Sequence, residues 1–277
     1  MSRPPPDVPS DLRDSLDPIV GAPARIVELP SGTTGPSYLV ETASRRYVAK
    51  VFAPAFHALL GPAEQFELMR VLAEAGIAAK PIGFDRQARL LVTEFLEGTA
   101  PLRPESLRRP ETIEKIVRCL RRLHTVNAKL PRFVPKAYAE RYVSRAGGLE
   151  SLSKQDRERY AELADLASAL EGLEGAVCHN DLLAENLLAN GDIKLVDFDY
   201  AVEAPPIVDL ASLVVMNNLS GDEADAVLDA YFSGRAPLPA AEFARVQRLT
   251  RLISHFWALA SGDVSAAIVA RYRMADD

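Results

Sequence analysis

The sequence is poor in cysteine and lacks long apolar runs. It has only two cysteines, Cys119 and Cys178, in no metal-binding spacing, so we expect no disulfide framework and a reducing environment. No apolar run is long enough to cross a bilayer, and residues 1–20 lack the apolar segment of a signal peptide. These absences predict a cytoplasmic protein with no membrane partner.

An excess of positive charge is also missing. The formal net charge is −6 and the sequence pI is about 5.4, which argues against nucleic acid as a partner. A modest acidic excess suits a cationic substrate, but it equally serves solubility. The hydrophobic share of 48% is ample for a core, and 277 residues favour one large domain or two lobes.

The first third of the chain has the pattern of a small β-rich lobe. Residues 1–23 are rich in proline and are predicted to be irregular. Aromatic and β-branched residues then predict strands, and an apolar stripe that ends before Gly76 predicts one helix. The predicted strands are 38–41, 46–52 and 90–96, and the predicted helix is 63–75.

After Gly98 the periodicity becomes helical. Apolar residues at helical spacing predict helices near 113–127, 160–170, 227–232 and 243–259. Between the second and third of these, Asn190-Gly191 predicts a hairpin turn between two short strands, 187–189 and 193–196. The predicted fold class is therefore α+β, with a small β-rich lobe over residues 1–97 and a mainly helical lobe over residues 98–277.

Three polar residues near this hairpin have a spacing that suits phosphoryl transfer. Asp181 and Asn186 match the aspartate and asparagine of the kinase catalytic pattern H-R-D-x-x-x-x-N, with Asn180 in place of the arginine. Asp197 follows the second strand of the hairpin, where a kinase places a metal-binding aspartate. Asp181 is the predicted base for an acceptor hydroxyl, and Asn186 and Asp197 are the predicted Mg²⁺ ligands.

The phosphates of the nucleotide require a cation and backbone N–H donors. Lys50, in a predicted strand after a loop of small residues, is the candidate for the α- and β-phosphates. Glu64, on the same helical stripe as Leu68 and Leu72, is preferred over Glu67 as the carboxylate partner of Lys50. The loop residues Gly32, Thr33 and Thr34 can offer backbone N–H groups, although an ordinary hairpin turn explains the same pattern.

Together these motifs resemble the aminoglycoside phosphotransferase and choline kinase family. The stretch His179-Asn180-Asp181-Leu182 with Asn186 is similar to the signature of that family, and Val196–Ala201 followed by Asp209-Leu210-Ala211 resembles its choline and ethanolamine kinase branch. The segment Ser254–Leu259 is similar to a helix of that branch that carries an aromatic side chain toward the choline site. We expect Asp209 to cap a helix that begins at Leu210 and to brace the catalytic loop.

The resemblance implies a protein-kinase-like fold, ATP and Mg²⁺ as cofactors, and an alcohol as acceptor. It places the adenine-side hinge at the end of the third predicted strand, on Glu94, Phe95 and Leu96. It also places the usual glutamate partner of the lysine at the position of Gln65. A glutamine at this position is a departure from the family pattern. GTP stays open as an alternative donor.

The acceptor is the least constrained part of the prediction. A quaternary ammonium requires aromatic faces and carboxylates, for which Asp199, Tyr200 and Trp257 are the candidates. Trp257 equally fits the core of an amphipathic helix, and His57, His124 and His255 are interpreted as structural. Choline, ethanolamine or a related amino alcohol is the preferred acceptor class. Aminoglycosides, thiamine or another sugar-like alcohol and a catalytically silent nucleotide-binding module are the alternatives.

Overall fold

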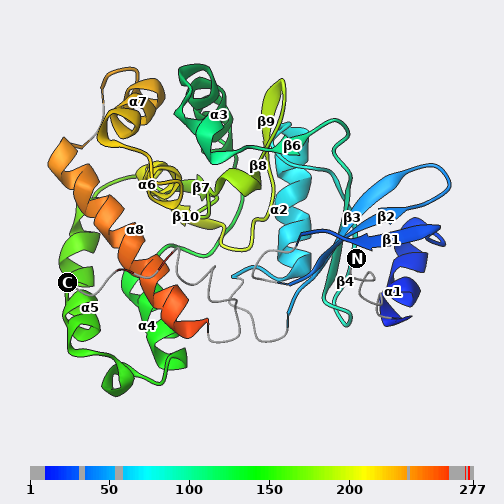
Figure 1. Ribbon diagram of the computed structural model, residues 1–277, viewed down its shortest axis with the longest axis horizontal. Coiled ribbons are helices and arrows are strands. Elements are labelled where there is room, and N and C mark those ends of the chain that lie inside the picture. The colour runs from blue at the N-terminus through cyan, green and yellow to red at the C-terminus, as the bar shows by residue number, and fades with distance from the viewer. Residues whose placement is uncertain are drawn as a thin grey trace, which may run out of the picture. The chain divides into compact units, whose positions relative to one another are not determined.

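The computed structural model describes residues 10–30, 35–53, 59–235, 238–261, 272 and 274 (Figure 1). The chain divides into two compact units. Unit 1 comprises Met1–Leu102 and Glu185–Ala201, and unit 2 comprises Arg103–Ala184 and Val202–Asp277. Antiparallel strands dominate unit 1 and helices dominate unit 2, so the predicted α+β class is confirmed.

Unit 1 is built on a five-stranded antiparallel sheet in the order β1-β2-β3-β5-β4. Burial alternates along β2 and β3, because successive side chains of a strand point to opposite faces of the sheet and one face lies on the core. Helix α2 packs against β4 and β5. The bounds are β1 Arg25–Glu28, β2 Ser37–Glu41, β3 Arg46–Val51, α2 Pro62–Glu74, β4 Pro81–Asp85 and β5 Leu90–Glu94.

The predicted hairpin groups with unit 1 instead of the helical lobe to which the prediction assigned it. Strand β8 (Leu187–Asn190) pairs with β9 (Asp192–Leu195) on one side and with β6 (Ala100–Pro101) on the other. The N–H of Leu195 donates to the carbonyl of Ile77 at 2.9 Å. These backbone bonds explain why residues 98–102 and 185–201 belong to unit 1, whereas the prediction ended the first lobe at residue 97.

The prediction that residues 1–23 are irregular is wrong for the described part of that segment, which contains helix α1 (Ser10–Val20). Leu12 and Leu16, four residues apart on one helix face, are buried in a cluster with residues of the sheet. Pro18 lies two residues before the helix ends, so the hydrogen bond that its missing N–H removes belongs to the last turn only. Helical spacing therefore outweighs proline content here.

Unit 2 is organised around helix α8, which packs against α4, α5 and α6, while α3 packs against α7 (Figure 1). The four predicted helices correspond to α3, α5, α7 and α8, whereas α4 was not predicted. Helix α6 begins three residues before Leu210, the residue at which a helix was expected to start. Strands β7 (Ala176–Cys178) and β10 (Val202–Ala204) pair antiparallel. The helix bounds are α3 Pro110–Leu123, α4 Pro135–Arg145, α5 Lys154–Ala167, α6 Ile207–Met216, α7 Gly221–Phe232 and α8 Ala240–Ala260.

Across the described residues, each helix is either too short or too polar to span a bilayer. Three 3₁₀ turns, Pro104–Arg108, Leu149–Ser151 and Ser168–Leu170, complete the elements of unit 2, and a fourth, Ala184–Asn186, lies where the chain passes into unit 1.

The packing of α1 predicts that Leu16→Ala destabilises unit 1. The Leu16 side chain is fully buried, so its truncation removes apolar contacts and leaves a cavity that costs about 2–5 kcal/mol. Urea unfolding of the variant measures this loss, with Asp14→Ala on the exposed face of the same helix as the control. Equal midpoints for the two variants would show that α1 does not stabilise the sheet.

Candidate functional site

Lys50 is the centre of a group of polar side chains in unit 1. It lies on β3, a strand paired on both sides, with Ser37 opposite on β2 and Leu91 opposite on β5. Its Nζ donates to Asp197 Oδ1 and to Asp199 Oδ2, both at 2.6 Å. Sequence reasoning assigned Asp197 and Lys50 to the same site, and the structure places them in direct contact.

The charge of Lys50 is stabilised by these two carboxylates. Burial by itself lowers the pKa of the Lys50 ammonium, but the negative charges and hydrogen bonds of Asp197 and Asp199 outweigh it, so the pKa is raised above its ordinary value. A raised lysine pKa stabilises the fold below the ordinary pKa, and this stabilisation is lost only as the pH rises through the folded-state value. Lys50 therefore stays charged at neutral pH.

The structure contradicts the predicted pairing of Glu64 with Lys50. Glu64 is exposed, and its carboxylate lies 3.9 Å from Arg86 Nη1. The next residue, Gln65, is the one that is buried, and its Nε2 donates to Asp199 Oδ1 at 2.5 Å. Both positions border the apolar stripe of α2, and the amide is buried at lower cost than a carboxylate.

Asp197 and Asn186 lie on neighbouring backbone segments of unit 1. Asp197 follows β9 with a left-handed φ of 67°, a conformation that aspartate tolerates better than most residues. The N–H of Val196, the residue before Asp197, donates to the carbonyl of Asn186 at 3.1 Å. An amide oxygen and a carboxylate oxygen are hard ligands that suit Mg²⁺, so these two residues fit the predicted metal role.

Asp199 does not have the role predicted for it. Its side chain is 1% exposed, and both carboxylate oxygens accept hydrogen bonds, one from Lys50 and one from Gln65. A contact between Asp199 and an acceptor alcohol therefore does not fit the structure. Tyr200, the other predicted substrate residue beside it, is half-buried in unit 1.

The loop over residues 179–184 in unit 2, which carries the predicted base Asp181, is fixed by the buried carboxylate of Asp209 on α6. The backbone N–H of His179 donates to Asp209 Oδ2 at 2.9 Å, and that of Asn180 donates to Oδ1 at 2.7 Å. Asn180 has a left-handed φ of 62°, which asparagine adopts more readily than arginine. The expectation that Asp209 braces this loop is confirmed, but Asp209 lies inside α6 and does not precede it.

Two further side chains of α6 and its C-terminal end hold the rest of the loop. Ser212 Oγ accepts from the N–H of Leu182 at 3.1 Å, and Asn217 Oδ1 accepts from the N–H of Ala184 at 2.9 Å. Asn217 also donates to the carbonyl of Leu182 at 2.7 Å. Sequence reasoning missed Ser212 and Asn217, although polar residues in so apolar a segment were a usable signal.

Asp181 lies between these fixed points and is half-buried. The hydroxyl of Tyr142 on α4 lies close enough to the Asp181 carboxylate for that charge to affect the pKa of the hydroxyl. Burial is the main cause that raises the pKa of the Tyr142 hydroxyl; Arg141 lowers it, and the charge of Asp181 raises it further. Sequence reasoning did not place α4 near the catalytic loop.

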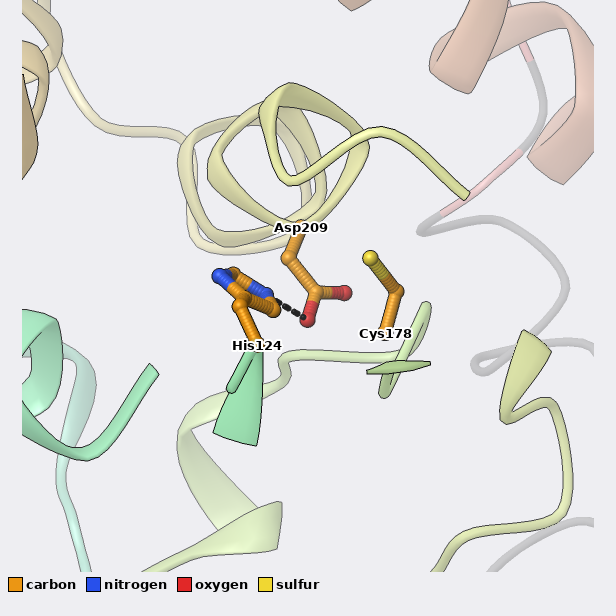
Figure 2. A group of neighbouring side chains, drawn as sticks. All are labelled: His124, Cys178 and Asp209. Carbon is orange, nitrogen blue, oxygen red and sulfur yellow. Dashed lines mark hydrogen bonds and ion pairs between the residues drawn. The ribbon is translucent and has the colours of Figure 1, made fainter. Parts of the chain in front are cut away.

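His124, Cys178 and Asp209 converge beneath the loop, and Figure 2 shows their side chains together. Their nitrogen, sulfur and oxygen atoms lie within 4.8 Å of one another, which is a metal-like grouping. Hydrogen bonds account for it: His124 Nε2 lies 3.0 Å from Asp209 Oδ2, and Cys178 Sγ donates to the carbonyl of Ala204 at 3.2 Å. Burial, and then the charge of Asp209, raise the pKa of Cys178 well above its ordinary value, so the thiol keeps its proton.

The contacts of His124 and His255 agree with their interpretation as structural residues. His124 also meets the hydroxyl of Tyr231, with 2.7 Å between Nδ1 and the oxygen. His255 on α8 is buried and its Nε2 lies 2.7 Å from Asp156 Oδ1. His57 lies outside the described residues, as do the predicted phosphate-loop residues Gly32, Thr33 and Thr34.

The predicted hinge follows β5 in unit 1. Glu94 donates from its backbone to the carbonyl of Lys80, and its side chain accepts from the N–H of Lys80. Phe95 donates to the carbonyl of Arg46, and its ring lies 4.4 Å from the guanidinium of Arg46. The carbonyl of Leu96 accepts from Thr99. Within the described part of the chain, the N–H of Leu96 has no backbone acceptor.

Trp257 on α8 is buried, as its alternative interpretation as a core residue requires. Its ring meets the ring of Tyr272 edge to face, with centroids 5.2 Å apart. The segment that carries Tyr272 is held by Met274, whose N–H donates to His255 Nδ1 at 3.0 Å. Tyr272 was not among the predicted site residues.

Comparison with known proteins decides the family. Residues 25–247 match the phosphotransferase enzyme family. The chain belongs to this family. The sequence-based prediction of a phosphotransferase is thus confirmed at the level of the family.

The curated proteins that resemble this phosphotransferase chain have low sequence identity to it. Protein LicA of Haemophilus influenzae is 26% identical over 164 residues, which cover 57% of this chain and 61% of that protein. Ethanolamine kinase 1 of Mus musculus is 25% identical over 183 residues, which cover 59% of this chain and 49% of that protein. The matches therefore span about half to three fifths of the length of these curated relatives.

Solved structures agree on the fold of the phosphotransferase chain. The crystal structure of choline kinase LicA from Streptococcus pneumoniae superposes with a TM-score of 0.82 at 22% identity, covering 95% of each chain. At this identity the likeness concerns the fold. The predicted protein-kinase-like fold is confirmed.

The bracing of the catalytic loop predicts that Asp209→Ala loosens it. The substitution leaves two buried backbone N–H groups and His124 without their acceptor, which costs about 3–5 kcal/mol. Hydrogen exchange measures the effect locally: the amides of His179 and Asn180 should lose protection before the core of α8. The exposed Asp225→Ala on α7 is the control. Unchanged protection at residues 179 and 180 would contradict the brace.

Proposed function

We propose that the protein is a Mg²⁺-dependent kinase that transfers the γ-phosphate of ATP to the hydroxyl of a small cationic alcohol such as choline or ethanolamine. The observation that carries the proposal is the contact of Lys50 with Asp197, on a segment that is hydrogen-bonded to Asn186. The proposed phosphate-binding cation thus contacts one proposed metal ligand, and the residue before that ligand is hydrogen-bonded to the backbone of the other, Asn186. Phosphoryl transfer depends mainly on such positioning and charge stabilisation.

The donor set at Asn186 and Asp197 suits Mg²⁺. Asn186 is 7% exposed and Asp197 has a side chain that is 29% exposed, so the carboxylate is the more accessible ligand. Bound Mg²⁺ supplies positive charge that offsets the developing charge on the phosphates. With one ammonium between two carboxylates, the Lys50 cluster keeps a net negative charge that attracts a divalent cation.

Nucleotide binding is assigned to unit 1. Lys50 holds the α- and β-phosphates, and residues 32–34 of the predicted loop are separated from β2 by two residues of sequence. At the end of this loop Gly35 has a φ of 144°, and a Cβ there would collide with the carbonyl of Val51, so only glycine fits so close to β3. At the hinge, the N–H of Leu96 offers a donor for the adenine edge, beside Glu94 and Phe95.

Asp181 is the proposed base. Its carboxylate accepts the hydroxyl proton of the acceptor as the oxygen attacks the γ-phosphate. Bonds from Asp209, Ser212 and Asn217 fix the backbone on both sides of Asp181, which holds the carboxylate in one orientation. Its partial exposure leaves it accessible to a substrate.

Trp257 and Tyr272 are the proposed aromatic contacts of a cationic acceptor. Ring faces attract ammonium groups, and quaternary ammonium groups have no N–H to donate. The net charge of −6 adds a favourable long-range field. Tyr200 is kept as a further proposed acceptor contact, because it follows the metal-binding segment in the sequence.

Two alternatives keep part of this account. An aminoglycoside, thiamine or another sugar-like alcohol would use the same mechanism with a different acceptor pocket. A catalytically silent module would be expected to lack one of Lys50, Asp181, Asn186 and Asp197, and the sequence retains all four.

Acceptor-dependent release of ADP tests the proposal. Purified protein with Mg²⁺ and ATP is assayed against choline, ethanolamine, thiamine and an aminoglycoside panel. We expect turnover with choline or ethanolamine, and a loss of about 10²–10⁴-fold in kcat for Asp181→Asn, which keeps the shape of the base and removes its charge.

The outcomes separate the alternatives. Turnover with an aminoglycoside or thiamine alone would keep the mechanism and replace the acceptor class. Full activity of Asp181→Asn would overturn the assignment of the base. Failure to bind nucleotide would overturn the kinase proposal itself. Asp222→Asn, an exposed aspartate at the start of α7, is the matched control.

A further inference from the structure

The side chain by which α2 contacts Asp199, a partner of Lys50, is an amide where the family resemblance led us to expect a carboxylate. Gln65 is 2% exposed, and its Nε2 donates to Asp199 Oδ1 at 2.5 Å and to the carbonyl of Leu60 at 3.3 Å. Both partners are acceptors only, so they require the –NH₂ end of the amide. A glutamate at position 65 would turn its own oxygens toward a carboxylate and a carbonyl.

The two carboxylates that hold Lys50 differ in their freedom. Asp199 is locked: one side-chain oxygen accepts from Gln65, the other from Lys50, and its backbone carbonyl accepts from the N–H of Leu59 at 2.8 Å. Its side chain is 1% exposed. Asp197 contacts the same ammonium, but its side chain is 29% exposed. One partner is therefore a fixed part of the fold and the other is accessible.

We infer that Asp199 is the permanent carboxylate partner of Lys50, that Gln65 is the positioning residue that fixes Asp199, and that Asp197 is a partner that Lys50 releases when nucleotide binds. This inference rests on the proposed function, because it assigns roles within the nucleotide site. When nucleotide binds, Asp197 becomes available as a metal ligand. The N–H of Lys50 that donated to Asp197 then becomes available to a phosphate oxygen. Asp199 keeps the ammonium in place during this exchange.

Charge explains why the residue at position 65 is neutral. Lys50, Asp197 and Asp199 together carry one net negative charge, and Gln65 adds a donor without adding charge. A glutamate would place a third carboxylate in the cluster and would repel Asp199 at close range. The inference therefore predicts that the substitution toward the common family residue impairs the site.

The test compares Gln65→Glu and Gln65→Met with the parent protein. Met keeps the approximate volume and removes the donor, whereas Glu reverses the interaction. We expect the KM for ATP to rise about 3–10-fold in Gln65→Met and more than tenfold in Gln65→Glu at pH 8, with the KM for the acceptor unchanged. Glu67→Gln, on the exposed face of the same helix, is the control.

A pH profile separates positioning from packing. Protonation of the introduced carboxyl group in the Gln65→Glu variant restores a hydrogen that can be donated to Asp199, so the affinity for ATP should recover toward the parental value between pH 8 and pH 6. The parent protein, assayed over the same pH range, is the control for every other effect of pH on the affinity for ATP. Equal ATP affinity in Gln65→Glu and the parent at pH 8 would overturn the inference.

A measurement without nucleotide distinguishes failure of this inference from failure of the proposed function. In Gln65→Glu the repulsion from Asp199 should lower the unfolding temperature at pH 8, and the deficit should shrink as the pH falls and one carboxyl takes up a proton. If the parent binds no nucleotide but this deficit is present, the kinase proposal fails and the Gln65–Asp199 coupling stands. A deficit that is absent at pH 8 contradicts the coupling itself.

Discussion

The ammonium group of Lys50, held between the carboxylates of Asp197 and Asp199, is the interaction on which unit 1 depends as a functional site. It joins the central strand β3 to the segment that follows β9, across 147 residues of sequence for Asp197. Burial opposes the charge on Lys50, and two carboxylates are needed to outweigh that cost. The site is therefore organised before any ligand arrives, which is how a protein lowers the cost of binding phosphates.

In both units a buried aspartate has a structural role, and a partly exposed aspartate is proposed to take part in the reaction. Asp199 in unit 1 and Asp209 in unit 2 are buried, and their oxygens accept from an ammonium, an amide or backbone N–H groups. Asp197 and Asp181 remain partly exposed and are the residues proposed for chemistry. In unit 1 the buried Asp199 orients Lys50, which also contacts the accessible Asp197. In unit 2 the buried Asp209 orients the loop that carries the accessible Asp181. Preorganised sites require such fixed supports.

The sequence predicted what depends on local pattern. Aromatic and β-branched residues predicted β2, β3 and β5, and Asn190-Gly191 predicted the β8–β9 hairpin that precedes Asp197. Spacing alone could not decide which neighbour on α2 is buried, because Glu64 and Gln65 both border the apolar stripe, and tertiary contacts with Asp199 select Gln65. Helix α1 was missed because proline content masked its apolar spacing, and Ser212 and Asn217 because their partners are distant backbone N–H groups.

The Mg²⁺ dependence of ADP binding tests the central claim, that Asp197 is shared between Lys50 and a metal-bound nucleotide. Calorimetric titration of ADP is carried out with Mg²⁺ and with a chelator, for the parent and for Asp197→Asn. We predict that Mg²⁺ tightens ADP binding more than tenfold in the parent and has little effect in the variant. Equal tightening by Mg²⁺ in both proteins, or none in the parent, would contradict the account.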